Sequence, residues 1–362
     1  MVAVRRRQVL AAGVAAAVLP LLAWSRSAGV EFSLGRRWPG GNRTPAPFAL
    51  SGETLYANGE AVAEGWDVAQ GKLRWRHPLA SAAVFRPRLS AGLVVTAGRF
   101  SLDARGVADG LPRWSIKPEQ ELGVPLVHDG RVFVGDGNRL LALDADTGAR
   151  LWAFETEGSS RIAYAPAGGA GRIYLGPGDG RLYALDASSG KPVWQVDRGG
   201  RWQYLRQLQI AGDLLVAGGY HDEIYGIEIT DGAVAWRFDA GNFVNSQLVH
   251  EGGVYFWSPT GWLYALDVRT GLARWRHRTS DFRGHIRSAD WAPVMAELAA
   301  HDGELIVLAM DHVLHRLDLK TGDEIARHPM PVPLRPFVTL DARRNSLWAA
   351  SVEGEVIELR LR

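Results

Sequence analysis

Ala184-Leu-Asp-Ala-Ser-Ser-Gly-Lys-Pro-Val-Trp194 is the clearest copy of an eleven-residue motif that organises this chain. Its aspartate stands four residues before its glycine, and the glycine stands four residues before the tryptophan. The motif returns at Ala142–Trp152 and Ala265–Trp275, and looser copies end at Trp75 and Trp236. A motif that recurs at a fixed period predicts a repeat architecture, so the length of 362 residues does not imply several domains.

Each copy lies in a longer unit that reads as four short strands. Residues 123–155 show the unit most clearly, with apolar runs at 124–128, 131–134, 140–144 and 150–154. Turns containing glycine separate these runs, and glycine reaches positive φ without a Cβ clash, as hairpin turns require. Antiparallel four-stranded units that repeat about every 40 residues predict an all-β fold, the β-propeller.

The number and spacing of the tryptophans indicate how many blades this propeller has. Trp75, Trp114, Trp152, Trp194, Trp236 and Trp275 are separated by 39, 38, 42, 42 and 39 residues. A seventh unit has Ala326 at the tryptophan position, and an eighth offers strands at 346–351 and 355–360 but no fourth strand. Residues 31–38 read as that missing strand, since Trp38 precedes Trp75 by 37 residues. We therefore predict eight four-stranded blades in a ring that is closed by the N-terminal strand, which removes the open edge.

The repeated aspartates and tryptophans have structural explanations. The aspartate precedes the turn between the third and fourth strands, where its carboxylate can accept backbone N–H bonds. The tryptophan offers a large flat surface that suits stacking on the glycine-containing turn of the next blade. We interpret these tryptophans as blade-to-blade docking residues and not as a ligand-binding ladder: Trp38, Trp75, Trp114, Trp152, Trp194, Trp236 and Trp275.

Composition excludes several classes of function. The chain has no cysteine, which excludes disulfides, thiolate metal sites, c-type haem attachment and a cysteine lipid anchor. A formal net charge of +2, with no basic run after the first residues, gives no nucleic-acid signature.

Residues 1–27 read as an export signal. Arg5, Arg6 and Arg7 precede an apolar run from Val9 to Trp24, and Arg6-Arg7-Gln-Val-Leu10 resembles the twin-arginine export motif. An uncleaved N-terminal anchor is the alternative. We expect residues 28–362 to form a single propeller that is exported to the periplasm or cell envelope.

The motif also carries a family resemblance. Ala-x-Asp-x-x-Thr-Gly-x-x-x-Trp, matched well at 142–152 and 265–275, resembles the tryptophan-docking motif of PQQ-like (pyrroloquinoline quinone) repeat propellers. Weaker copies extend the resemblance over about residues 30–362. Within this family the chain is most similar to BamB-like outer-membrane assembly factors, which are eight-bladed and closed by an N-terminal strand. BamB proteins are typically lipoproteins, and the acceptor cysteine is absent here.

This resemblance implies a non-catalytic, monomeric scaffold that binds an envelope protein, such as an outer-membrane barrel-assembly protein, and no nucleic acid. PQQ-dependent alcohol and sugar dehydrogenases carry the same docking motif and supply the alternative. Their adjacent cysteine pair is absent here, and we can place no match to their calcium site. We therefore expect no cofactor, with PQQ and calcium as the alternative for a ligand-binding sensor or a divergent quinoprotein dehydrogenase.

The loops suggest where a partner would bind. Second-to-third-strand loops share one face of a propeller with the blade-to-blade connections, and function in repeat folds tends to occupy the face that accepts insertions. The longest connections are 198–206 and 279–291, with shorter ones at 40–43 and 241–245. They predict a basic and aromatic rim of Arg201, Trp202, Tyr204, Arg206, Arg283, His285, Arg287 and Trp291.

Three interpretations of this rim are open. Arginine and aromatic residues dominate protein–protein hot spots, which favours a partner surface. An arginine pair with a stacking tryptophan also suits a planar anionic ligand. In the third interpretation, the loops only pack over the mouth of the channel.

No catalytic or metal motif stands out. The sequence has no nucleophile elbow, no phosphate loop and no carboxylate pair apart from the repeated structural aspartates. His312 and His315 are three residues apart, and His221 begins a His-Asp-Glu run, but neither set has enough ligands at metal spacing. We expect these histidines to be solvated loop residues, and we predict neither catalytic residues nor a metal site.

Overall fold

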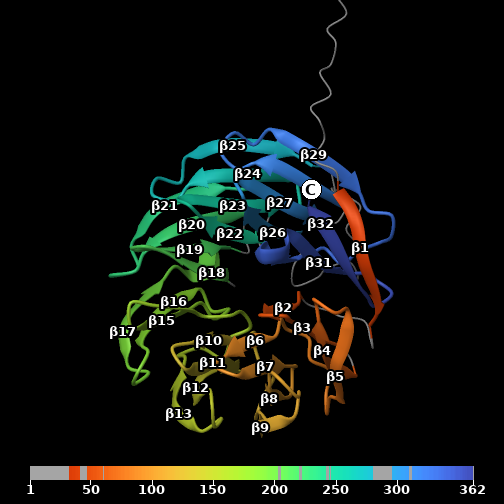
Figure 1. Ribbon diagram of the computed structural model, residues 1–362. Coiled ribbons are helices and arrows are strands. Elements are labelled where there is room, and N and C mark those ends of the chain that lie inside the picture. Colours follow the sequence, from red (N-terminus) through yellow and green to blue (C-terminus); the bar gives the residue numbers. More distant parts are fainter. Residues whose placement is uncertain are drawn as a thin grey trace, which may run out of the picture.

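The computed structural model describes residues 32–40, 47–59, 61–202, 205–219, 222–241, 244, 246–279, 296–309 and 312–361. These residues form eight antiparallel sheets of four strands, which follow one another around a ring in chain order (Figure 1). The prediction of an all-β, eight-bladed propeller is confirmed. Within these ranges, no helix is long and apolar enough to cross a membrane.

The first four blades follow the repeat read from the sequence. Blade 1 contains β2 (Ala49–Ser51), β3 (Thr54–Asn58), β4 (Val62–Asp67) and β5 (Lys72–Pro78). Blade 2 contains β6 (Arg88–Ser90), β7 (Leu93–Ala97), β8 (Leu102–Gly106) and β9 (Pro112–Ile116). Blade 3 contains β10 (Leu126–His128), β11 (Arg131–Asp136), β12 (Arg139–Asp144) and β13 (Arg150–Glu155). Blade 4 contains β14 (Ala167–Gly169), β15 (Arg172–Leu175), β16 (Arg181–Asp186) and β17 (Pro192–Asp197).

The described residues of the second half of the ring include two short 3-10 helices. Blade 5 contains β18 (Arg206–Ala211), β19 (Leu214–Gly218), β20 (Glu223–Glu228) and β21 (Val234–Asp239), and η1 (Gly199–Trp202) precedes it. Blade 6 contains β22 (Gln247–His250), β23 (Gly253–Ser258), β24 (Trp262–Asp267) and β25 (Ala273–Arg278). Blade 7 contains β26 (Ala296–His301), β27 (Glu304–Ala309), β28 (Val313–Asp318) and β29 (Glu324–Pro329). Blade 8 contains β30 (Thr339–Asp341), η3 (Ala342–Arg344), β31 (Ser346–Ala350), β32 (Glu355–Leu361) and, from the other end of the chain, β1 (Phe32–Pro39).

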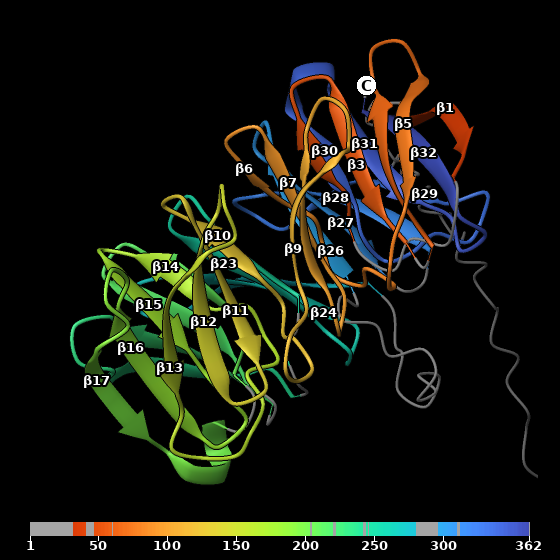
Figure 2. The ribbon, with the colours of Figure 1, turned by 90° about the horizontal axis from the view of Figure 1, so that it is seen from below.

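Successive turns alternate between the two faces of the ring, because neighbouring strands in each blade run antiparallel (Figure 2). The second-to-third-strand turns and the blade-to-blade connections lie on one face, here called the connection face. The first-to-second and third-to-fourth turns lie on the other, here called the motif face. The first strands of neighbouring blades contact one another from blade 8 through blade 1 to blade 7, so they form the inner wall of the ring.

The motif joins each blade to the next. Trp152 on β13 lies against Gly190 in the motif turn of blade 4, and its indole Nε1 donates to the Ala187 carbonyl at 3.2 Å. Gly190 has a φ of 72°, and a Cβ there would lie 2.5 Å from the indole ring, so the position requires glycine. The other docking pairs are Trp38 with Gly71, Trp75 with Gly110, Trp114 with Gly148, Trp194 with Gly232, Trp236 with Gly271 and Trp275 with Gly322.

The hydrophobic core is divided among the seams between blades. Eight clusters of buried apolar side chains occur, and each contains residues from two neighbouring blades. A single four-stranded sheet has two apolar faces and cannot bury both alone, so each blade depends on both of its neighbours. This arrangement fixes the relative positions of the turns on both faces.

The N-terminal strand closes the ring, as the sequence predicts. β1 pairs antiparallel with β32, and Trp38 lies opposite Val356. The Trp38 indole stacks between Trp66 of blade 1, at a centroid distance of 5.0 Å, and Trp348 of blade 8, at 4.8 Å. Three aromatic rings from two blades therefore seal the seam where the two ends of the chain meet.

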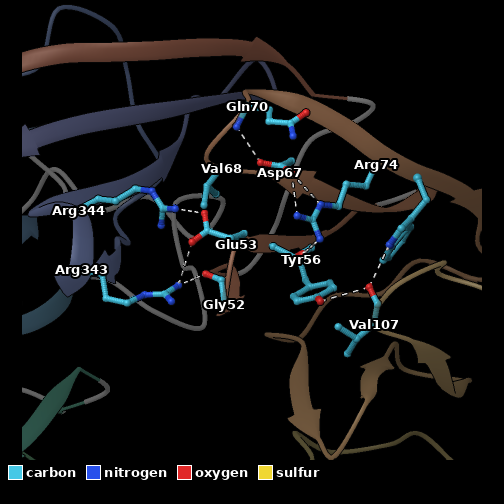
Figure 3. Close-up of polar contacts among 12 residues, drawn as sticks. Gly52, Glu53, Tyr56, Asp67, Val68, Gln70, Arg74, Val107, Arg343 and Arg344 are labelled. Atoms are coloured by element: carbon cyan, nitrogen blue, oxygen red, sulfur yellow. Dashed lines mark hydrogen bonds and ion pairs between the residues drawn. The ribbon is translucent and has the colours of Figure 1, made fainter.

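Polar contacts reinforce this seam on the motif face (Figure 3). Arg344 of blade 8 pairs with Glu53 of blade 1, and Arg343 donates to the Gly52 carbonyl. Beside them, Asp67 accepts a hydrogen bond from the Gln70 backbone N–H at 2.7 Å. The first-to-second turn of blade 8 is thereby tied to the corresponding turn of blade 1.

The same closure explains why blade 7 lacks a docking tryptophan. A tryptophan at Ala326 would dock on the third-to-fourth turn of blade 8. That blade takes its third strand, β32, from one end of the chain and its fourth strand, β1, from the other, so no motif turn joins them. The alanine is therefore the expected consequence of the way in which the ring is closed.

Candidate functional site

The predicted rim lies largely outside the described residues. Five of its eight members fall there: Tyr204, Arg283, His285, Arg287 and Trp291. The backbone of Arg201 lies in η1 and that of Arg206 at the start of β18, both next to the connection between blades 4 and 5. The rim as a partner or ligand surface stays a prediction.

Trp202 is placed differently from the expectation. Its side chain is only 1% exposed and belongs to the apolar cluster between blades 4 and 5. Its ring meets Tyr225 edge-on at a centroid distance of 5.8 Å, and the Arg198 guanidinium lies over it at 5.5 Å. The indole is thus within the core under the connection and is not accessible to a partner, which corrects its assignment to an exposed rim.

Next to this region, the connection face over blades 2 to 4 carries an arc of paired charges. Glu121, in the connection from blade 2 to blade 3, pairs with Arg99 at 3.3 Å and with Arg161. Arg99 comes from a turn of blade 2 and Arg161 from the connection between blades 3 and 4. One carboxylate therefore ties together three loops of this face.

A second carboxylate, at the end of β11, has a similar role. Asp136 is buried and accepts hydrogen bonds from the backbone N–H groups of Glu119, at 3.3 Å, and Gln120, at 2.6 Å. Arg139 pairs with Asp136 at 2.8 Å and with the Glu119 carboxylate at 2.9 Å. The hydrogen bond to Glu119 is the main reason that the pKa of Arg139 is raised.

Blade 4 repeats the arrangement. Arg181 pairs with Asp179 at 3.1 Å and with Asp197 at 3.2 Å. The hydrogen bond to Asp179 is the main cause of the raised pKa of Arg181. The charges of the arc are therefore largely satisfied within the protein, so they order the loops without leaving a strong field of one sign.

Phe100 stands out within this arc. It lies in the short turn between β7 and β8, beside Arg99, and it is 63% exposed. Among the residues that the structure describes, the other large exposed apolar side chains lie on fourth strands or the turns leading to them: Leu34, Leu73, Leu111, Leu151, Val193 and Leu272. Only Phe100 among them lies on the connection face.

Sequence reasoning missed Phe100, although a signal was present. The turn reads Gly98-Arg-Phe-Ser101, whereas the equivalent turn of blade 3 is made of Gly137 and Asn138. A phenylalanine at the tip of a short hairpin has few neighbours that could bury it. A short turn gives a weaker sequence signal for a binding surface than the long connections do, although it can hold an exposed aromatic side chain.

The histidines also differ from expectation. His315 lies on β28 and is 1% exposed, so the interpretation of it as a solvated loop residue is wrong. Its Nδ1 lies 3.2 Å from a carboxylate oxygen of Glu324, and the ring of His277 lies nearby. Burial is the main reason that the pKa of His277 is lowered. Among the described residues, these three form one group close enough to share a metal ion.

His312 and His221 complete the account of the predicted histidines. His312 occupies the turn before β28, and its Nδ1 lies 3.1 Å from the Leu334 carbonyl of blade 8. It therefore contacts the neighbouring blade and does not join His315. His221 falls outside the described residues.

Solved structures similar to this chain share its fold. BamB from Moraxella catarrhalis matches with a TM-score of 0.73 and 19% identity, over 92% of this chain and 98% of that chain. The quinohemoprotein alcohol dehydrogenase from Comamonas testosteroni matches with a TM-score of 0.72 and 13% identity, over 91% of this chain and 76% of that chain. The computationally designed Ika8 protein matches with a TM-score of 0.73 and 15% identity, over 89% of this chain and 98% of that chain. At these identities the matches establish the propeller fold alone.

Sequence comparison identifies the family. No curated protein sequence matches the chain significantly. The family model described as "Outer membrane protein assembly factor BamB" matches residues 101–210 and 179–335, which together span well over half of the 362 residues. The docking motif, the eight four-stranded blades and the closure by β1 agree with this match. The chain belongs to the outer membrane protein assembly factor BamB family.

Proposed function

We propose that this protein is a non-catalytic scaffold that binds another protein during cell-envelope protein assembly. In this proposal the chain is exported, residues 1–27 direct it to the envelope, and the propeller works there as a monomer. The partner is an envelope protein, such as an outer-membrane barrel-assembly protein. Membership of the BamB family supports the proposal, since assembly is the role that the family description names.

The connection face is the proposed binding surface. Its loops over blades 2 to 4 are held by ion pairs within the protein, so little conformational entropy would be lost when a partner binds. A pre-ordered surface of this kind suits a scaffold, because the propeller positions the partner without rearranging itself.

The observation that carries the proposal is the exposure of Phe100. An aromatic side chain that is 63% exposed loses apolar contact with water when a partner covers it. The surrounding pairs of Arg99 with Glu121 and of Arg161 with Glu121 form a polar border, which is the arrangement found around interface hot spots. Phe100 would therefore be the anchor and its charged neighbours the rim.

Quantitative affinity capture from envelope extracts tests the proposal. Phe100→Ala should weaken capture of the envelope partner by about thirtyfold, because removing a hot-spot side chain costs about 2 kcal/mol or more. Leu272→Ala is the matched control, since Leu272 is 70% exposed but lies in a turn of the motif face. The control should capture the partner as the unmodified chain does.

A second variant tests the region of the surface that was predicted from sequence. Replacing Arg283, Arg287 and Trp291 together by alanine should weaken capture while the melting temperature changes little. If capture is unchanged in both this variant and Phe100→Ala, the connection face is not the binding surface. If no envelope protein is captured by the unmodified chain, the scaffold proposal itself fails.

A further inference from the structure

At three seams between blades, equivalent positions carry pairs of rings in a similar geometry but with different chemistry. The side chain two residues after a docking tryptophan meets the side chain three residues before the motif aspartate of the next blade. Phe154 meets Tyr183 at a centroid distance of 5.4 Å and an angle of 63°, and Phe238 meets Tyr264 at 5.3 Å and 65°. Between blades 6 and 7 the pair is His277 and His315, at 6.2 Å and 64°.

The carboxylate of Glu324 joins the two imidazoles at this seam, and no other copy of the repeat has a carboxylate at the equivalent position. Glu324 lies two residues before the tryptophan position of its repeat, where the other copies have Arg36, Leu73, Pro112, Arg150, Pro192, Val234 and Ala273. Its Oε1 lies 3.2 Å from His315 Nδ1 and 3.6 Å from His277 Nε2. The aromatic pair found between blades 3 and 4 and between blades 5 and 6 is thus replaced at this seam by a group of three possible metal ligands.

The separations from Glu324 Oε1 to the two imidazole nitrogens suit a tetrahedral metal. Three ligand atoms at about 2.0–2.1 Å from a zinc ion lie about 3.4 Å from one another. The two measured separations, 3.2 and 3.6 Å, bracket this value, and all three ligand atoms lie within 4.8 Å of one another. The side chains come from β25, β28 and β29, whose backbones are fixed by their sheets.

The burial of the group supports a ligand. His277 Nε2 is buried and makes no hydrogen bond among the described residues, which is costly for a polar atom unless something else satisfies it. The equivalent residue of blade 1, His77, has no such deficit, because its Nε2 bonds the Asp109 carbonyl at 2.9 Å. A metal ion would satisfy His277 Nε2, which lies 3.6 Å from Glu324 Oε1, beyond hydrogen-bond distance.

A cation also contacts the group. Arg327 Nε donates to Glu324 Oε1 at 2.9 Å. Carboxylates that bind metals are themselves commonly hydrogen-bonded, and such a donor holds the carboxylate in position. Arg327 is exposed, so solvent screens its charge from the group.

We propose that His277, His315 and Glu324 bind a divalent transition metal of the Zn²⁺ type at the seam between blades 6 and 7. Two imidazoles and one carboxylate are a donor set that Zn²⁺ accepts, and three protein ligands leave one coordination position open. Glu324 is about a quarter exposed, with a side-chain exposure of 28%, so that position is accessible from the outer edge of the ring. The metal would join blade 6 to blade 7, and this inference does not depend on the proposed scaffold function.

The test is titration of the full chain, prepared without a histidine tag, with Zn²⁺ alone and then with Co²⁺ as a spectroscopic probe. We expect one Zn²⁺ per chain by calorimetry, a rise in melting temperature that saturates, and visible absorption typical of tetrahedral Co²⁺. Glu324→Gln should weaken Zn²⁺ binding by at least about a hundredfold, because it replaces a charged ligand by a neutral amide.

Two further variants keep the test decisive. The double variant His277→Phe, His315→Tyr recreates the Phe–Tyr pair found between blades 3 and 4 and between blades 5 and 6, so it should fold and lose the Co²⁺ absorption. His77→Phe, at the equivalent position of blade 1, should leave Zn²⁺ binding unchanged. The proposal is overturned if the unmodified chain shows no saturable binding of one ion, or if Glu324→Gln and the double variant bind Zn²⁺ as the unmodified chain does.

Discussion

The aspartate of the motif acts locally, on its own turn. Asp186 Oδ1 accepts hydrogen bonds from the backbone N–H groups of Ser188, at 3.1 Å, and Ser189, at 2.8 Å, and from both serine hydroxyls, at 2.6 and 2.7 Å. The hydroxyl bonds, and then the backbone bonds, lower the pKa of Asp186 to about 2. Four donors on one oxygen favour the ionised carboxylate in the folded state.

This residue gives a prediction of pH dependence. The pKa of Asp186 is lower in the folded chain than the unfolded value of about 3.9, so its ionised form stabilises the fold above about pH 4. That contribution is lost as the pH falls through the folded pKa of about 2. In urea unfolding, the difference in midpoint between the unmodified chain and Asp186→Asn should therefore shrink as the pH falls from 4 to 2.

The control for this prediction is another acidic residue in a motif turn. Asp146 is exposed, and its backbone N–H, not its carboxylate, bonds Asp144. At pH 4, Asp146→Asn should destabilise the protein less than Asp186→Asn does, because the substitution keeps the backbone N–H that makes this hydrogen bond. A difference for Asp186→Asn that stays constant down to pH 2 would contradict the proposed role of its carboxylate.

At the scale of the element, β1 decides whether the ring is closed. It supplies the fourth strand of blade 8, and its Trp38 belongs to the apolar cluster between blades 8 and 1. Without that indole, Trp66 and Trp348 would lose the ring stacked between them. In the other blades a motif turn connects the third strand to the fourth, but no such turn connects β32 to β1. The attachment of β1 therefore depends more strongly on this one side chain.

We therefore expect Trp38→Ala to destabilise the protein by about 3–5 kcal/mol, the range for truncation of a large aromatic side chain in a core. Leu34→Ala on the same strand should cost less than about 0.5 kcal/mol, because Leu34 is exposed. Chemical denaturation followed by circular dichroism measures both changes. Equal effects of the two substitutions would show that the tryptophan stack does not hold β1.

At the scale of the whole molecule, the ring behaves as one packing unit. Each of the eight apolar clusters spans two blades, so each blade is held by both of its neighbours. The propeller is therefore a rigid platform on which the face loops are presented. BamB and an alcohol dehydrogenase share this platform, so the fold by itself does not identify the function.

A thermal-shift titration with PQQ, with and without calcium, separates the two classes for this chain. The scaffold proposal predicts no change in melting temperature, because only a ligand that binds the native state raises it. A saturable, calcium-dependent rise would instead assign the chain to the cofactor-binding class, and oxidation of alcohols would be the next assay.

The sequence by itself determined the architecture. The spacing of Asp186, Gly190 and Trp194 encodes a turn and a docking contact by local rules, so its repetition gives both the blade count and the closing strand. The repeat period also identifies Trp38, which precedes Trp75 by 37 residues and belongs to the strand that pairs with β32. The blade count and the closing strand could be predicted because they depend on residues that are close in sequence or separated by one repeat.

Only the tertiary structure decided which side chains face solvent and which meet across a seam. Trp202 resembled a surface aromatic in a polar loop, yet it is buried because blades 4 and 5 close over it. Phe100 lay in an inconspicuous turn and is exposed because the described residues leave the tip of that turn uncovered. His277 and His315 are 38 residues apart and come within reach of Glu324 only when two blades pack together. Burial and long-range proximity depend on neighbouring blades, and no local pattern of residues records them.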